Sequence, residues 1–93
     1  MGKFRVKIEK LAEIHISQHY KSGNKAIIKK ISDIIVSLSE DPYHGPGRPE
    51  PLKYELQGYW SRRITQKDRM IYKVHDAEVT VLVISASGHY FDK

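Results

Sequence analysis

Residues 25–40 read KAIIKKISDIIVSLSE, and isoleucine and leucine recur in them at the spacing of one helix face. The apolar stripe consists of Ile27, Ile31, Ile34 and Leu38, with Ile28 and Ile35 beside it. Charged residues occupy the other side of the same helix. The pattern predicts an amphipathic helix that packs against another helix and a sheet.

The segment before this helix predicts a strand followed by a shorter helix. Phe4, Val6 and Ile8 alternate with basic residues, which is the period of a half-buried strand. Residues 9–21 predict a helix, and the Ser-Gly-Asn sequence at 22–24 is typical of a helix end.

After residue 40 the sequence predicts strands only. Residues 41–51 hold all four prolines, so no helix is expected there. Strands are predicted at residues 53–57, 59–65, 69–74 and 79–86, and the last is apolar enough to be buried on both faces. We therefore predict an α+β fold: an N-terminal strand, a two-helix hairpin, and a mostly antiparallel four-stranded meander with the helices on one face.

The length and composition limit the possible functions. A chain of 93 residues predicts a single domain, residues 1–93, with one core and no room for a large enclosed cofactor. The absence of cysteine excludes disulfides, thiolate metal sites and cysteine nucleophiles, and it is compatible with a reducing cytoplasm. We expect neither a signal peptide nor a membrane span, and we expect a cytoplasmic protein.

The positive charge is concentrated in one part of the chain. The formal net charge is +5, and residues 48–73 hold seven bases against three acids. Such a stretch favours RNA or DNA as a partner through phosphate contacts, but charge alone is equally compatible with a solvated basic face.

Cleavage of RNA without a metal ion needs few groups. A base takes the proton of the 2′-hydroxyl, an acid protonates the departing 5′-oxygen, and cations stabilise the added negative charge at phosphorus. Glutamate and histidine suit the proton transfers, and the planar guanidinium of arginine binds two phosphate oxygens at once. The candidates are Glu50 between two prolines, Arg69 at the start of a predicted strand, and His89 near the end of the chain.

The strand pattern limits how these candidates can converge. The residues at positions 70, 72 and 74 form a core-facing row, so Arg69 should point to the opposite face. Arg62 and Arg63 are adjacent in a predicted strand, so at most one of them can share that face. Taken alone, each candidate is also typical of an ordinary exposed residue.

Several other residues have a simpler structural interpretation. His15 and His19 have the i,i+4 spacing of a helical metal pair, but no third ligand is evident, so we interpret them as helix surface or core edge. Tyr59 and Trp60 could stack on bases, although a large aromatic in an antiparallel sheet is more often core. We expect no metal or cofactor, and we expect His15 and His44 to be dispensable for activity.

Four motifs of the C-terminal half resemble a known family. They are PEPLK at 49–53, GYWSRRI at 58–64, DRMIY at 68–72 and HY at 89–90. Together they resemble the YoeB (Txe) branch of the RelE/ParE toxin superfamily, from about Ile27 to Tyr90. The resemblance implies a RelE-like fold and a ribosome-dependent mRNA interferase that is inhibited by an antitoxin, expected to be Phd/YefM-like. It also implies that homodimers can form.

The resemblance further implies roles for individual residues. Glu50 matches the general base, His89 the general acid, Arg69 the arginine that stabilises the transition state, and Tyr90 the tyrosine of the closing pair. Lys53 and Arg63 match residues that hold the phosphate or the RNA, and we assign Arg62 to the same RNA-binding group. The chain departs from the family pattern after Tyr90, where Phe91-Asp92-Lys93 follow and Asp92 adds a negative charge.

Two other functions compete with the ribonuclease. One is a ParE-like inhibitor of DNA gyrase, which shares the superfamily but lacks this set of residues. The other is a non-catalytic module that binds RNA or the ribosome, for which Glu50 and His89 would not matter. The combination of Glu50 with the His-Tyr pair favours the ribonuclease.

Overall fold

The computed structural model describes residues 3–88 and has the predicted α+β order of elements. The elements are β1 (Arg5–Ile8), α1 (Lys10–Ser22), α2 (Lys25–Glu40), β2 (Glu50–Pro51), the 3₁₀ turn η1 (Tyr54–Leu56), β3 (Tyr59–Arg63), β4 (Arg69–His75), the 3₁₀ turn η2 (Asp76–Glu78) and β5 (Thr80–Ser85). Within this described part, neither helix is long and apolar enough to cross a membrane.

The two helices form where local signals mark their ends. Gly23 adopts a left-handed backbone with φ of 75° and ends α1. Asn24 caps α2, because its side chain accepts hydrogen bonds from the backbone N–H groups of Ala26 and Ile27. α2 has the predicted bounds, and α1 starts and ends one residue later than predicted.

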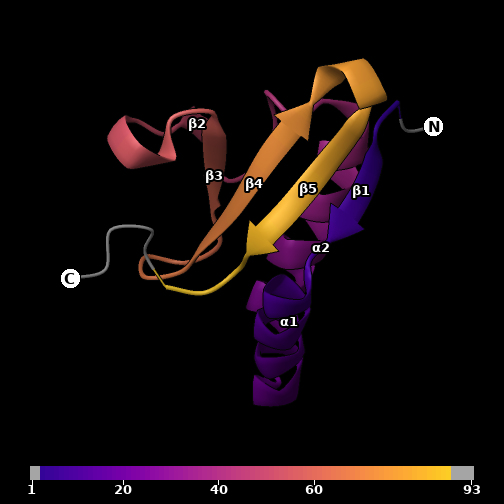
Figure 1. Cartoon of the computed structure of the whole chain (residues 1–93). Coiled ribbons are helices and arrows are strands. Elements are labelled where there is room, and N and C mark those ends of the chain that lie inside the picture. Colours follow the sequence, from indigo (N-terminus) through magenta and orange to yellow (C-terminus); the bar gives the residue numbers. More distant parts are fainter. Residues whose placement is uncertain (1–2, 89–93) are drawn as a thin grey trace.

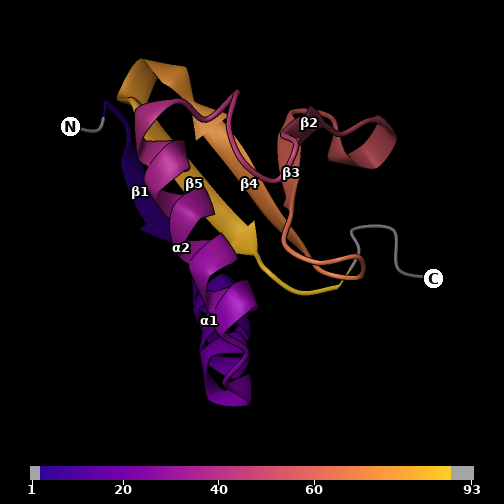
Figure 2. The same ribbon diagram turned by 180° about the vertical axis from the view of Figure 1, so that it is seen from behind.

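The strands form one five-stranded sheet in the order β1-β5-β4-β3-β2. Strands β2 to β5 make a four-stranded antiparallel meander, as predicted, although β2 is not the predicted first strand. β1 pairs with β5 in parallel at the edge. The strands lie in front of the helices in Figure 1, and α2 lies in front of the sheet in the reverse view of Figure 2. The helices therefore cover one face of the sheet, and we call the other the open face.

The core lies between the helices and the covered face. Its buried side chains come from α2 and from alternate positions of β4 and β5: Ile31, Ile34, Leu38, Met70, Tyr72, Val81 and Val83. Burial of each such side chain contributes about 1.5–3 kcal/mol. On the open face of β5, Leu82 and Ile84 are only half-buried, so the prediction of a strand buried on both faces holds for one face only.

One predicted strand is wrong. Residues 54–56 within the predicted strand 53–57 form η1 instead, since Tyr54 has φ of 58°, a left-handed conformation that a strand does not accept. In its place Glu50–Pro51 pairs with β3 as a short edge strand, a position where proline is tolerated. Glu50 therefore lies in the sheet, directly opposite Ser61.

Candidate functional site

A polar pocket of about 400 Å³ lies at the edge of the sheet that β2, β3 and β4 form. It is lined by Arg48, Pro49, Glu50, Arg63 and Arg69. Three of the residues predicted from the sequence, Glu50, Arg63 and Arg69, thus come together. Arg48 and Pro49 line the same pocket without having been predicted as site residues.

The strand register explains why these side chains meet. Arg63 lies directly opposite Arg69, and Glu50 lies opposite Ser61, which is two residues before Arg63. Residues that are opposite, or two apart in one strand, share a face of the sheet. Like charges in directly opposed positions destabilise a sheet. The Arg63–Arg69 pair therefore favours an anion bound between the two guanidinium groups.

Glu50 and Arg69 form an ion pair in this pocket. Arg69 Nη1 lies 3.6 Å from Glu50 Oε1, and the side chains are 15% and 55% exposed, respectively. The guanidinium thus lies deep, and the carboxylate lies where a ligand can reach it. A pair with one partner this exposed contributes at most about 1 kcal/mol, so a ligand can replace it at little cost.

The loop before β2 brings Arg48 to the pocket. The Gly47 carbonyl accepts a 2.6 Å hydrogen bond from the Arg63 N–H. Gly47 has φ of 87°, and a Cβ there would lie 3.0 Å from the Arg63 carbonyl oxygen, so this close approach requires glycine. Arg48 follows with φ of 53°, which is rare for a residue with a side chain and is found more often at functional sites. The sequence signal for this loop was the pair of glycines at 45 and 47.

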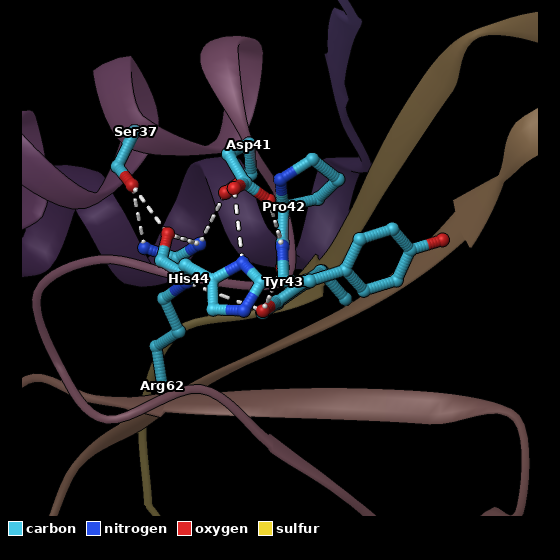
Figure 3. A network of polar contacts seen from close by, with 7 residues as sticks. Ser37, Asp41, Pro42, Tyr43, His44 and Arg62 are labelled. Atoms are coloured by element: carbon cyan, nitrogen blue, oxygen red, sulfur yellow. Dashed lines mark hydrogen bonds and ion pairs between the residues drawn. The ribbon is translucent and has the colours of Figure 1, made fainter.

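Arg62 is not part of the pocket, and its assignment to RNA binding is wrong. Its side chain is fully buried on the covered face. It donates five hydrogen bonds of 2.8–3.2 Å, to Ser37 Oγ, the Tyr72 hydroxyl and the carbonyls of Asp41, His44 and Pro46. Figure 3 shows this network between α2, the loop after it and β3. All five N–H groups of a guanidinium are thereby used, and none remains for a ligand.

The Arg62 network holds the loop that leads to the pocket. All five acceptors of the Arg62 guanidinium are neutral hydroxyl or carbonyl oxygens, and none of them is a carboxylate. The Tyr72 hydroxyl accepts from Arg62 and donates to the Pro42 carbonyl at 2.7 Å. Burial raises the pKa of Tyr72, and the nearby guanidinium acts in the opposite direction. Arg62 is therefore a structural residue that joins the loop 41–46 to the sheet.

Asp68 connects the β3–β4 turn to the chain after β5. Its carboxylate accepts hydrogen bonds from the Thr65 hydroxyl at 3.1 Å and from the Gly88 N–H at 2.9 Å. The Gly88 carbonyl in turn accepts from the Arg69 N–H at 3.1 Å. Burial acts to raise the pKa of Asp68, but the hydrogen bonds from Gly88 and Thr65, together with the nearby His19 and Lys67, outweigh it and hold the pKa below its usual value. Gly88 is thus tied to the strand start that carries Arg69.

The remaining predicted site residues lie outside the pocket or outside the described residues. Lys53 is exposed beyond β2 and is not among the lining residues. His89 and Tyr90 lie outside the described residues.

Ser61, opposite Glu50, has a buried hydroxyl with no hydrogen-bond partner within residues 3–88. Over that same range, no cluster of three histidine or carboxylate side chains suited to a metal ion is found.

The chemistry of the pocket follows from its charges. Three arginines and one carboxylate surround a space large enough for a phosphate and part of a sugar. Arginine binds phosphate oxygens through its planar fork, and a carboxylate beside a bound phosphodiester can accept a proton from a hydroxyl of the same ligand. The arrangement can therefore bind a phosphodiester and deprotonate a neighbouring hydroxyl.

Comparisons of the sequence point to one family. The family model of the YoeB-like toxin of bacterial type II toxin-antitoxin systems matches residues 12–90. The chain is similar to Toxin YoeB of Synechocystis sp., with 39% identity over 85 residues that cover 87% of this chain and 96% of the relative. The match therefore includes all the pocket residues.

Solved structures agree with the sequence comparison. The YoeB/ParE toxin from Agrobacterium tumefaciens superposes with a TM-score of 0.82 at 31% identity, covering 94% of this chain and all of that one. Two structures from Staphylococcus aureus are a YoeB dimer and a YoeB–YefM complex, with TM-scores of 0.77 and 0.75. They share 29% and 31% identity and cover 95% and 94% of this chain, and 99% and 98% of their own chains.

Proposed function

The chain belongs to the family of YoeB-like toxins of bacterial type II toxin-antitoxin systems, and we propose that it is an endoribonuclease that cleaves mRNA on the ribosome without a metal ion. The observation that carries the proposal is the pocket in which Glu50 meets Arg48, Arg63 and Arg69. This combination supplies both a proton acceptor and a binding site for the scissile phosphate.

The reaction is an attack of the substrate on itself. Glu50 takes the proton of a 2′-hydroxyl, the 2′-oxygen bonds to the adjacent phosphorus, and the bond from phosphorus to the 5′-oxygen breaks. Arg69 and Arg63 stabilise the charge that builds up on the phosphate oxygens. We assign the proton for the 5′-oxygen to His89, with Tyr90 beside it, on the basis of their motif. The products are a 2′,3′-cyclic phosphate and a 5′-hydroxyl.

We propose three further properties on the strength of family membership. The toxin acts in the bacterial cytoplasm, where mRNA is translated. A cognate antitoxin of the Phd/YefM-like kind binds and inhibits it, as the YoeB–YefM complex from Staphylococcus aureus suggests. It can form a homodimer, in line with the YoeB dimer from the same organism.

The test of the reaction is single-turnover cleavage of mRNA on programmed ribosomes. Glu50→Gln is expected to lower the rate about 10²–10⁴-fold because it removes a proton acceptor. Glu55→Gln is the matched control, since it removes an exposed carboxylate from η1 outside the pocket and should leave the rate unchanged. Wild-type activity should persist in EDTA when the integrity of the ribosomes is monitored separately.

Mapping of the product ends decides between mechanisms. A 5′-phosphate on the downstream fragment would refute the proposal, because that chemistry uses water rather than the 2′-hydroxyl as the nucleophile. A supercoiling assay with DNA gyrase tests the ParE-like alternative. If Glu50→Gln binds ribosomes and arrests translation as well as wild type does, the non-catalytic module is the correct function.

A further inference from the structure

Two histidines of α1 bind the backbone of one residue just after β5. His15 Nδ1 accepts a hydrogen bond from the Ala86 N–H at 3.1 Å, and His19 Nε2 donates to the Ala86 carbonyl at 2.9 Å. An amide N–H can only donate and a carbonyl can only accept, so His15 has an unprotonated Nδ1 and His19 has a proton on Nε2. The two side chains thus perform opposite roles on a single residue.

Ala86 needs these partners because β1 ends too early to supply them. β1 pairs with β5 from Arg5 opposite Thr80 to Ile8 opposite Val83, and the chain then enters α1. Ala86 is fully buried, and buried backbone groups have to be hydrogen-bonded. The two imidazoles, one helical turn apart, replace a neighbouring strand at this edge.

The same segment reaches the candidate site two residues later. Both backbone groups of Gly88 are bonded: its N–H to Asp68 Oδ1 at 2.9 Å, and its carbonyl to the Arg69 N–H at 3.1 Å. Residues 86–88 therefore connect α1 to the start of β4, where Arg69 enters the pocket. His89, the residue assigned as the general acid, follows Gly88 directly in the chain.

We propose that His15 and His19 are positioning residues, which hold residues 86–88 through Ala86 and thereby align Arg69 for cleavage. The proposal rests on the proposed function, because the effect is expected on the cleavage step. It replaces our expectation from the sequence that His15 is dispensable. Misplacement of a catalytic group by about 1 Å can lower a rate about 100-fold, so a small shift of this segment is sufficient.

The test uses pairs of variants that remove or retain each hydrogen bond. His15→Leu removes the acceptor, whereas His15→Asn retains an oxygen close to the position of Nδ1. His19→Met removes the donor, whereas His19→Gln retains an N–H close to the position of Nε2. Gln18→Leu is the control for a change to an apolar side chain on the same helix, since Gln18 is exposed.

The cleavage rate, the affinity for ribosomes and amide hydrogen exchange are measured for each variant. Single-turnover cleavage on programmed ribosomes should be about 10- to 100-fold slower for His15→Leu and His19→Met, with unchanged ribosome affinity. His15→Asn, His19→Gln and Gln18→Leu should cleave at close to the wild-type rate. Amide hydrogen exchange should be faster at Ala86 and Gly88 in the two slow variants only.

The outcomes separate this proposal from the proposed function. If exchange at Ala86 and Gly88 rises while cleavage stays at the wild-type rate, the positioning role is refuted. If exchange does not change in His15→Leu and His19→Met, the two histidines do not hold the segment. A wild-type protein that cleaves no mRNA refutes the proposed function instead, and the exchange data then still decide whether the histidines fix residues 86–88.

Discussion

Arg62 and Arg63 are neighbours in β3, and the alternation of side chains along a strand places them in opposite environments. Arg62 points to the helices, where oxygen acceptors surround it, and Arg63 points to the open face and lines the pocket. A charge that is buried without a partner costs several kcal/mol, but the five hydrogen bonds of Arg62 offset that cost. The same residue type therefore stabilises the fold at one position and lines the candidate site at the next.

Substitution of the two arginines should separate stability from activity. Arg62→Met removes the five hydrogen bonds of a buried guanidinium and leaves the Pro46 carbonyl without its donor. A hydrogen bond to a charged group contributes about 1.5–3 kcal/mol. We expect the free energy of unfolding to fall by about 3 kcal/mol or more. Arg63→Met should change it by about 0.5 kcal/mol or less but should lower the cleavage rate about 10²–10³-fold. Urea unfolding followed by circular dichroism, together with single-turnover cleavage, tests both statements; equal loss of stability in the two variants would contradict them.

At the level of single residues, part of the candidate site could be predicted from the sequence. The motifs around Glu50, Arg63 and Arg69 indicated three residues that the structure does bring together. The sequence also required Arg62 and Arg63 to diverge, but the face of each depends on the register of β3 against β4. Arg48 was missed because its position in the pocket depends on a left-handed backbone, and the residue type arginine does not indicate that conformation.

At the level of elements, prediction succeeded where local interactions decide the structure. The bounds of α2 follow from its apolar stripe and from the Asn24 cap, both of which are readable in the sequence. The strand predicted at residues 53–57 failed because Tyr54 adopts a positive φ that its residue type disfavours. The pairing of β1 with β5 joins distant parts of the chain, and only the register of the whole sheet determines it.

Asp68 in the β3–β4 turn should make the stability of the fold depend on pH in the acid range. The pKa of Asp68 is lower in the folded protein than its usual value, so the ionised carboxylate stabilises the fold. This contribution is fully present above the unfolded pKa of about 3.9 and is lost as the pH falls through the lower folded value. Asp68→Asn should therefore reduce the free energy of unfolding more at about pH 7 than at about pH 3. Denaturant unfolding at both pH values measures the difference.

Asp33→Asn is the control for the acid-stability experiment. Asp33 forms an exposed i,i+4 pair with Lys29 on α2, and such pairs contribute about 0.3–0.5 kcal/mol. Its substitution should therefore have a small effect at both pH values. If Asp68→Asn loses as much stability in acid as at neutral pH, the hydrogen bonds to Thr65 and Gly88 do not depend on the charge of the carboxylate.

At the level of the whole molecule, the fold assigns different tasks to the two faces of the sheet. The covered face buries the apolar core together with Arg62, and the open face presents the arginines of the pocket at one edge. The tip of the helical hairpin extends beyond the sheet in both views (Figures 1 and 2). This tip carries the basic residues Lys21 and Lys25, which lie apart from the arginines of the pocket. Both groups of residues contribute to the net charge of +5.

This separation allows a test of how the antitoxin recognises the toxin. An acidic antitoxin segment that blocks the substrate should lie over Arg63 and Arg69, because opposite charges and a shared site favour that position. Arg63→Glu with Arg69→Glu lowers the net charge from +5 to +1, as does Lys21→Glu with Lys25→Glu at the exposed hairpin tip. Isothermal titration with the proposed Phd/YefM-like antitoxin should show at least about a tenfold loss of affinity for the arginine pair and little change for the lysine pair. The Kd of the wild-type protein should rise with salt. Equal weakening by both pairs would mean that overall charge, and not the pocket, attracts the antitoxin.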